Sequence, residues 1–328
     1  MKSIKSLGER EVINIILRRL EMPEMPVPFG DDVSAIRISG DLLAVLKTDM
    51  LVGKTDVPPT MSLRQAARKA VIMNISDFAA KGVKPLAILV SLGLPRDLKE
   101  DDVKEIGAGL NEGAREYDAY VIGGDTNEAS DLIISCSLLG FSSKKKLVSR
   151  SGAKPGDIVA VTGEFGKTAA GLKILLEGLS LPEKVGGPLK EAVLMPRARL
   201  KEGLALSETG GLTASIDSSD GLAWSLYELS DASDVGFMID NVPVAWEAVE
   251  FARAYNFDPL ELSLYGGEEY ELVVTVKPEF WEEAKKAVEK VGGSLTGIGV
   301  ATEEKEIKLK VNGKVRGIER KGWEHFKM

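Results

Sequence analysis

Apolar positions along residues 1–143 alternate between helical and extended spacing. Stretches that repeat every three or four residues predict helices at 9–20, 63–81 and 99–117. Shorter apolar runs predict strands at 33–38, 42–47, 86–94, 118–122 and 131–141. The helix at 63–81 has the clearest ends, because Ser62 and Gln65 have capping-box spacing and Gly82 follows where a helix commonly stops.

A second pattern begins after the turn-rich segment 150–157. It predicts strands at 158–162, 213–217, 235–239, 271–276, 295–300 and 306–311, and helices near 168–178, 220–230, 244–254 and 278–291. Asn312-Gly313 is a typical hairpin turn between the strand at 306–311 and a further strand after it. Alternation of this kind favours an α/β or α+β layered fold. We therefore expect two domains, 1–143 and 144–328, with a boundary near residue 144.

Composition narrows the possible functions. The chain has 328 residues, of which 44% are hydrophobic and 28% charged, as in a globular protein with more than one core. A net charge of −8 argues against a nucleic-acid partner. No segment has the apolar length of a membrane span and no signal peptide is evident, so we expect a cytoplasmic protein. Cys136 and His325 are each the only residue of their type, which excludes Ser-His-Asp, Cys-His and poly-His zinc chemistry.

The candidate chemistry lies in aspartates that stand beside glycine or hydroxyl residues after apolar runs. Such carboxylates cannot gather at one point without raising each other's pKa, and divalent cations with oxygen ligands relieve that repulsion. Mg²⁺ is the usual ion where phosphates share the site, so the pattern favours phosphoryl transfer from a nucleotide. The segments are Gly30-Asp31-Asp32, Thr48-Asp49, Asn74-Ile75-Ser76-Asp77, Gly123-Gly124-Asp125-Thr126 and Asp217-Ser218-Ser219-Asp220.

One glycine-rich turn imitates a P-loop. Gly166-Lys167-Thr168 follows a predicted strand and opens a predicted helix. The Walker pattern requires a glycine five residues before Gly166, where this chain has Val161. The P-loop interpretation therefore fails, and the turn is either an anion site at a helix start or a plain tight connection.

Taken in order, these motifs resemble those of the thiamine-monophosphate kinase family, within the superfamily that includes aminoimidazole ribonucleotide synthetase and selenophosphate synthetase. The resemblance runs nearly from end to end. Besides the aspartate segments it rests on Asp49-Met50-Leu51-Val52, Phe78-Ala79-Ala80-Lys81-Gly82, Arg150-Ser151-Gly152-Ala153, Ile216-Asp217, Gly221-Leu222, Gly266-Gly267-Glu268-Glu269-Tyr270-Glu271-Leu272 and Lys321-Gly322-Trp323-Glu324-His325-Phe326.

The resemblance implies ATP as co-substrate and direct transfer of its γ-phosphoryl group to thiamine monophosphate, giving thiamine diphosphate, with several Mg²⁺ ions taking part. It also implies a homodimer whose amino-terminal domains join their sheets into a shared β-barrel, with the active site between the two domains. No general base is needed, because the attacking phosphate oxygen is already anionic at neutral pH. Positioning and charge neutralisation then carry the catalysis.

The resemblance also assigns residues. The predicted metal-binding residues are Asp32, Lys47 (through its backbone), Thr48, Asp49, Asp77, Asp125, Asp217 and Asp220, of which Asp32, Asp49, Asp77 and Asp125 form the catalytic set. The predicted ATP-binding residues are Gly124, Asp125, Arg150, Ser219 and Tyr117. The predicted substrate-binding residues are Asp56, Glu268 and Trp323. Each residue also has a purely structural alternative. The aspartates could be helix caps or turn residues, and Asp220 is the strongest case because it precedes a predicted helix as an N-cap would. Gly123 and Gly124 could form a tight turn, Arg150 a surface ion pair, Tyr117 a core contact, and Trp323 a contact that fixes the chain end to the core.

The sequence departs from the family pattern at three positions. Asp56 stands where many members have a histidine, which indicates a different hold on the substrate phosphate, through Lys54 for example, or a different acceptor. Lys47 replaces a small hydroxyl residue and Glu269 an aspartate. Two alternatives stay open: a cyclo-ligase or selenophosphate type of enzyme acting on another acceptor, and a non-catalytic nucleotide and Mg²⁺ sensor.

Overall fold

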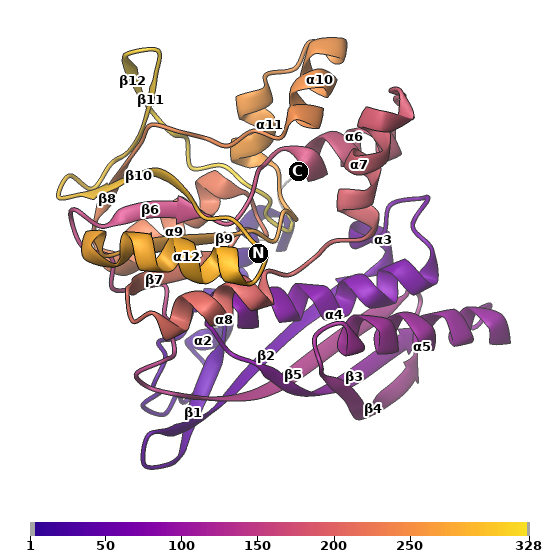
Figure 1. Cartoon of the computed structure of the whole chain (residues 1–328). Helices are drawn as coiled ribbons and strands as arrows, with labels where there is room; N and C mark the ends of the chain where they lie inside the picture. The colour runs from indigo at the N-terminus through magenta and orange to yellow at the C-terminus, as the bar shows by residue number, and fades with distance from the viewer. Residues whose placement is uncertain (1–3, 327–328) are drawn as a thin grey trace.

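The computed structural model describes residues 4–326 and builds them around two β-sheets (Figure 1). The first sheet has the strand order β1-β2-β5-β3-β4, with only β3 and β4 parallel. Its strands are β1 (Ser34–Ser39), β2 (Leu42–Val52), β3 (Pro85–Leu94), β4 (Tyr120–Glu128) and β5 (Ile133–Ser143).

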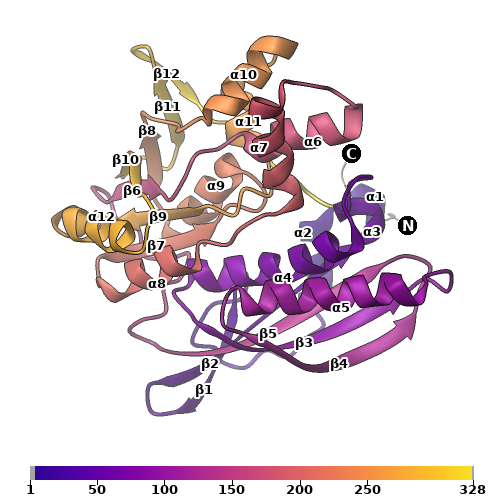
Figure 2. The ribbon, with the colours of Figure 1, turned by 45° about the vertical axis from the view of Figure 1, so that its right-hand side comes forward.

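One helix, α4, lies between the two sheets. Fourteen of its eighteen residues are buried, because it packs on the first sheet, on α5 and on the second half of the chain (Figures 1 and 2). Ser62 and Gln65 form the predicted capping box at its start. The helices of the first half are α1 (Ile4–Leu7), α2 (Glu9–Leu17), α3 (Gly53–Asp56), α4 (Leu63–Ala80) and α5 (Glu100–Arg115).

The second sheet has the strand order β12-β11-β8-β10-β6-β9-β7. Its strands are β6 (Ile158–Val161), β7 (Leu212–Asp217), β8 (Gly236–Ile239), β9 (Leu272–Val276), β10 (Thr296–Thr302), β11 (Ile307–Val311) and β12 (Lys314–Gly317). The helices are α6 (Lys167–Glu177), α7 (Glu183–Leu194), α8 (Leu200–Glu208), α9 (Leu222–Ser233), α10 (Trp246–Tyr255), α11 (Pro259–Tyr265) and α12 (Trp281–Lys290), with a 3₁₀ turn, η1, at Pro278–Phe280. None of the helices within 4–326 has the length and apolarity needed to cross a membrane.

The predicted mixed α/β fold is confirmed, whereas several details were wrong. The strand predicted at 118–122 continues to Glu128 because it stays paired with β3, so Gly123-Gly124-Asp125-Thr126 lies within a strand and not at a turn. Likewise Asp49 lies inside β2, which continues to Val52 along β5. The helices α7, α8 and α11 were not predicted. The division at residue 144 stays a prediction, since one buried cluster contains residues of both halves.

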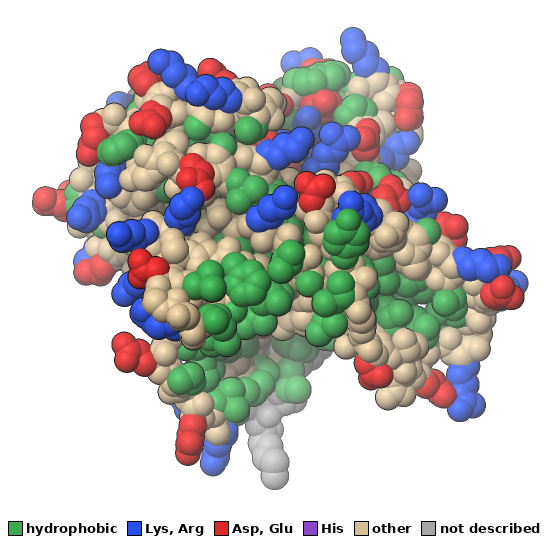
Figure 3. Space-filling view, turned by 60° about the horizontal axis from the view of Figure 1, so that its bottom comes forward, with side chains coloured by type: hydrophobic (Ala, Val, Ile, Leu, Met, Phe, Trp, Pro, Cys, Tyr) green, Lys and Arg blue, Asp and Glu red, His purple; other side chains and the backbone are tan. Residues whose placement is uncertain are grey.

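The face of the first sheet opposite α4 carries many apolar side chains, and no other element within residues 4–326 covers it. We call it the open face, and Figure 3 shows apolar side chains gathered on this side of the molecule. Contiguous exposed apolar surface of this kind marks an interaction surface on many proteins. Its exposed members are Ile36, Leu42, Leu46, Met50, Leu89 and Phe141.

Candidate metal and phosphoryl-transfer site

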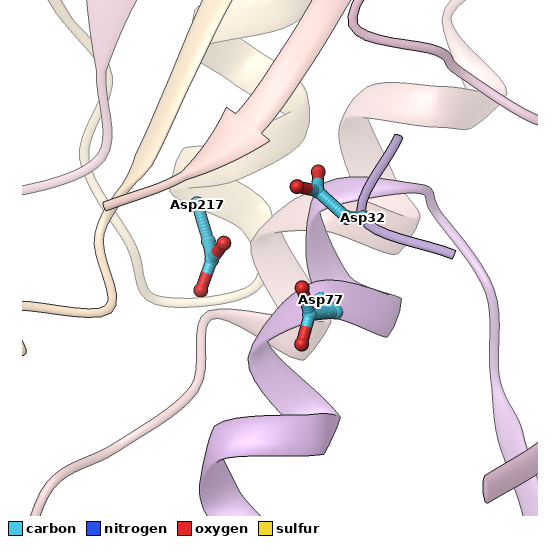
Figure 4. A group of neighbouring side chains, drawn as sticks. All are labelled: Asp32, Asp77 and Asp217. Carbon is cyan, nitrogen blue, oxygen red and sulfur yellow. The ribbon is translucent and has the colours of Figure 1, made fainter. Parts of the chain in front are cut away.

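Three buried aspartates meet between the two halves of the chain. Asp32 precedes β1, Asp77 lies in the last turns of α4, and Asp217 ends β7 (Figure 4). One carboxylate oxygen from each lies within 4.8 Å of the other two. The three residues are only 3–6% exposed. Because hard oxygen donors at this separation suit Mg²⁺, the triad fits the predicted metal centre.

The triad is held by its neighbours on α4 and β7. Ser76 Oγ donates a hydrogen bond of 2.6 Å to Asp217 Oδ2, which ties α4 to the end of β7. Burial, together with the charge of Asp32, raises the pKa of Asp217 to about 6. Burial also raises the pKa of Asp77 well above its ordinary value, although Lys47 opposes that shift. Two of the three carboxylates therefore lack full neutralisation by the protein itself.

Asp32 is the exception, because two cations face it. The Nζ atom of Lys81 lies 2.7 Å from Asp32 Oδ2 and 2.6 Å from Asp31 Oδ1. Arg150 also forms an ion pair with Asp32, and its Nε donates at 2.8 Å. Burial alone would raise the pKa of Asp32, but Lys81 and Arg150 outweigh it and lower the pKa. Asp31 positions these groups, since it also accepts the Arg150 backbone N–H at 2.9 Å.

Asp49 approaches the triad from β2. Lys47 Nζ lies 3.1 Å from Asp49 Oδ1 and 3.0 Å from Asp77 Oδ2, so one ammonium group joins the strand to the helix. The two carboxylates raise the pKa of Lys47 against the opposing effect of burial. The backbone N–H of Asp49 donates to Asn74 Oδ1 at 2.9 Å, which fixes β2 against α4.

Asp220 follows the triad on the turn between β7 and α9. Burial, with Glu9 and Asp217 nearby, raises its pKa to about 7. Asp220 is not the N-cap of α9, because Gly221 occupies that position. Its carbonyl accepts the backbone N–H of Trp323 at 3.1 Å, so the carboxy-terminal segment lies against this turn. Trp323 itself is 55% exposed.

The predicted substrate residues meet around a buried lysine. Lys69 on α4 is 1% exposed, and its Nζ lies 2.5 Å from Glu268 Oε1 and 2.9 Å from the Asp56 carbonyl. Asp56 Oδ2 accepts the backbone N–H of Val52 at 2.7 Å. Glu268 has a φ of 64°, an unusual backbone conformation for a residue other than glycine. The backbone N–H of Glu268 donates to the Ser219 carbonyl at 2.6 Å, which brings the predicted nucleotide and substrate segments together.

Several predicted residues do not join the triad in this chain. Thr48 points to the open face, where Ser137 Oγ donates to its Oγ1 at 3.0 Å. Asp125 is in register with Met50, through Ser91 and Ser135, and so lies on that same face. Two strands separate β4 from β2, roughly 14 Å at ordinary strand spacing.

Two other predicted nucleotide residues have structural contacts. A Cβ on Gly124 would lie 1.8 Å from the Val90 carbonyl oxygen, so close approach of β3 and β4 explains this glycine. The Tyr117 hydroxyl accepts the Ala198 backbone N–H at 2.9 Å and anchors the loop before α8.

Sequence reasoning missed two of the most buried cations. Lys81 is fully buried at the C-cap of α4 and donates to the Ser215 carbonyl at 2.6 Å. Its place at a helix C-terminus, where cations are favoured, and beside Gly82 was a usable signal. The sequence around Lys69 contained no such signal, because its ion-pair partner, Glu268, is almost two hundred residues away in the chain.

The turn that imitates a P-loop is closed by an acidic side chain. Glu269 Oε1 accepts the Gly166 backbone N–H at 2.6 Å and that of Thr168 at 3.3 Å, where an anion would otherwise bind. Burial raises the pKa of Glu269 to about 7. A cavity of about 680 Å³ opens beside this helix start, with Lys167 and Arg197 in its wall.

Comparison with known proteins gives this geometry a family. The models for AIR synthase related protein, N-terminal and C-terminal domains, match residues 30–142 and 154–312. Thiamine-monophosphate kinase of Pyrococcus abyssi is 37% identical over 325 residues, covering 98% of this chain and 97% of the relative. The chain belongs to the thiamine-monophosphate kinase family. The member from Nitrosopumilus maritimus is 35% identical, covering 99% of this chain and 100% of the relative.

A solved structure described as AaThiL complexed with AMPPCP and TMP has the same architecture. Its TM-score to this chain is 0.87 at 29% identity, and 99% of each chain is covered. The resemblance inferred from the motifs is therefore confirmed, and so is the two-domain AIR synthase-like fold.

Proposed function

We propose that this chain is a thiamine-monophosphate kinase, which transfers the γ-phosphoryl group of ATP to thiamine monophosphate and releases ADP and thiamine diphosphate. The observation that carries the proposal is the buried triad of Asp32, Asp77 and Asp217, contributed by both halves of a chain that matches this family from end to end. The AaThiL complex supports it, since AMPPCP is an analogue of ATP in which the β–γ bridge resists transfer.

We propose Mg²⁺ as the ion, in several copies. The triad would hold one ion, and Asp220 lies where it could help to hold another. Asp49 also lies beside the triad, although its carboxylate is paired with Lys47 in this chain. When bound, such ions would supply positive charge that neutralises the negative charge developing during phosphoryl transfer.

Nucleotide binding would involve Arg150 and Ser219. Arg150 has a planar fork of donors suited to phosphate, and in this chain it already spans Asp32, the Gly30 carbonyl and Glu228. It can keep the contacts that orient it while another N–H turns to a phosphate oxygen. Ser219 is exposed on the turn beside Asp220, next to the triad.

The acceptor would lie near Glu268, Asp56 and Trp323. Lys69 is a positioning residue here, because its ammonium holds the Glu268 carboxylate and the Asp56 carbonyl at fixed places. The exposed ring of Trp323 offers an aromatic face to a cationic thiazolium or an aminopyrimidine. The attacking phosphate oxygen is already ionised at neutral pH, so these residues orient the acceptor and do not remove a proton.

We also propose a homodimer that buries the open face, as the family resemblance implies. Thr48 and Asp125 lie on that face, so dimerisation would change their surroundings as well as cover the apolar strands. Analytical ultracentrifugation of Leu89→Lys tests this, because a charge on β3 within the open face should yield a monomer. Leu176→Lys, on the exposed side of α6, is the matched control and should leave the dimer intact. The cytoplasmic location stays a prediction that cell fractionation can test.

The deciding experiment follows thiamine diphosphate and ADP with ATP, Mg²⁺ and thiamine monophosphate. We expect turnover by the natural chain and its loss in Asp77→Asn. Asp157→Asn is the control, since Asp157 is equally buried but bonds to Lys154 and Thr213 outside the triad. If ATP and Mg²⁺ bind but no thiamine diphosphate forms, the proposed acceptor is wrong.

A further inference from the structure

Lys47 is the only lysine in the described residues whose ammonium lies between Asp49 and Asp77. It comes from β2, where residues 47 and 49 point to the same face, and it reaches Asp77 on α4. The side chain is 17% exposed, so solvent does little to replace these contacts. An ammonium at 3.0–3.1 Å from two carboxylates occupies the kind of position that a bridging cation takes.

The cations of the site are unevenly distributed. Lys81 and Arg150 neutralise Asp31 and Asp32 at one end. Lys47 neutralises the Asp49 end. Asp217 has no ion pair within residues 4–326 and is held by the Ser76 hydroxyl instead. The Asp49 side of the site therefore has a lysine as its counter-ion, whereas the Asp217 side has no cationic side chain paired with it among the described residues.

From this distribution we propose that the Lys47 ammonium takes the place of a divalent ion between Asp49 and Asp77, while the triad keeps its own ion. The inference rests on the proposed function, because it assumes that the triad binds metal. It adds a role that the family resemblance did not assign to this residue, whose expected contribution was through its backbone.

A lysine in this place has a chemical consequence. An ammonium group has three donors, and that of Lys47 forms ion pairs with two carboxylates, those of Asp49 and Asp77. The third can donate to a phosphate oxygen of the nucleotide. The Asp49 side would then carry a permanent positive charge that needs no metal from solution.

The test counts Mn²⁺ ions bound per chain without nucleotide, by isothermal titration calorimetry and by electron paramagnetic resonance of free Mn²⁺. We expect Lys47→Met to bind one more Mn²⁺ per chain than the natural protein, because Asp49 and Asp77 become available. Lys47→Arg should keep the natural number. The double variant Lys47→Met/Asp49→Asn should lose the extra ion, and it retains charge balance if the single variant folds poorly. Lys146→Met removes an exposed surface lysine and should change nothing.

A second readout is the melting temperature in EDTA. Lys47→Met should melt below the natural protein, and Mn²⁺ should raise its melting temperature by more than it raises that of the natural chain. The same number of ions in both proteins would overturn the proposal, even with tighter binding in the variant, since Lys47 would then only compete for an existing site. Counting ions needs no turnover, so absence of thiamine diphosphate formation would refute the proposed acceptor without affecting this result.

Discussion

The raised pKa of Asp217 predicts that one substitution, Asp217→Asn, changes the stability of the protein in opposite directions with and without metal. Asp217→Asn removes a buried charge but keeps an oxygen that can accept the Ser76 hydrogen bond. The pKa of Asp217 is about 6, against an ordinary value of 3.8. A difference of about two units corresponds to roughly 3 kcal/mol against the charged form in the folded state. In EDTA at pH 7 the variant should therefore be more stable than the natural protein, by up to about 3 kcal/mol.

The pH dependence follows from the direction of the shift. A carboxyl whose folded pKa is raised contributes stability below its unfolded pKa of 3.8, and that contribution is lost as the pH rises to about 6. The advantage of Asp217→Asn should thus be absent below pH 3.8 and complete above pH 6. Mg²⁺ at a thousand times its dissociation constant should reverse the order at pH 7, because it adds about 4.1 kcal/mol to the protein that binds it, which exceeds the advantage of the variant.

Urea denaturation at several pH values, in EDTA and in Mg²⁺, measures both effects. Asp157→Asn is the matched control. It should be less stable than the natural chain in both buffers, because Asp157 accepts hydrogen bonds from Lys154 and Thr213. The reasoning is refuted if Asp217→Asn is the less stable protein in EDTA at pH 7, or if its advantage persists at pH values below 3.8.

Three further predictions concern the supports of the site. Lys81→Met should lower the free energy of unfolding by about 3–5 kcal/mol in urea, since it leaves Asp32 without its fully buried partner; a loss below 1 kcal/mol would show that Arg150 suffices. Gly124→Ala should cost about 3 kcal/mol, because its Cβ would lie 1.8 Å from a carbonyl oxygen of β3. Gly123→Ala meets its nearest atom at 3.5 Å and should be tolerated, so equal losses would contradict this account. Cys136 is fully buried with its pKa raised to about 12 by burial and by Asp49, and should react with a thiol reagent only after unfolding.

The sequence predicted those parts of the fold that depend on residues close together in the chain. The capping box of α4 and the apolar run that ends at Asp217 were readable from neighbouring residues. The prediction that Gly124 and Asp125 lie in a turn was wrong. Glycines normally indicate a turn, but here pairing with β3 continues β4 through both residues. The helix α7 contains Pro188, which obscures its helical spacing.

Some parts of the candidate site could likewise be predicted from the sequence, and others could not. The sequence pattern correctly brought Asp32, Asp77 and Asp217 together. It could not place the cations, because the partners of Lys69 and Lys81 are set by how the two halves of the chain pack. Nor could it show that Thr48 faces away from Asp49, which depends on strand register and on where the strand ends.

The long sequence separation of Ser76 and Asp217, which a hydrogen bond joins, also limits when the site can form during synthesis. The two residues are 141 positions apart, and the first sheet is complete in sequence by Ser143. A nascent chain can therefore fold its first sheet well before the third carboxylate has left the ribosome. Metal cannot be captured by the triad at that stage, so the ion would report on a finished polypeptide and would not guide its early folding. Chains truncated before Asp217 should accordingly fail to bind the ion at the triad.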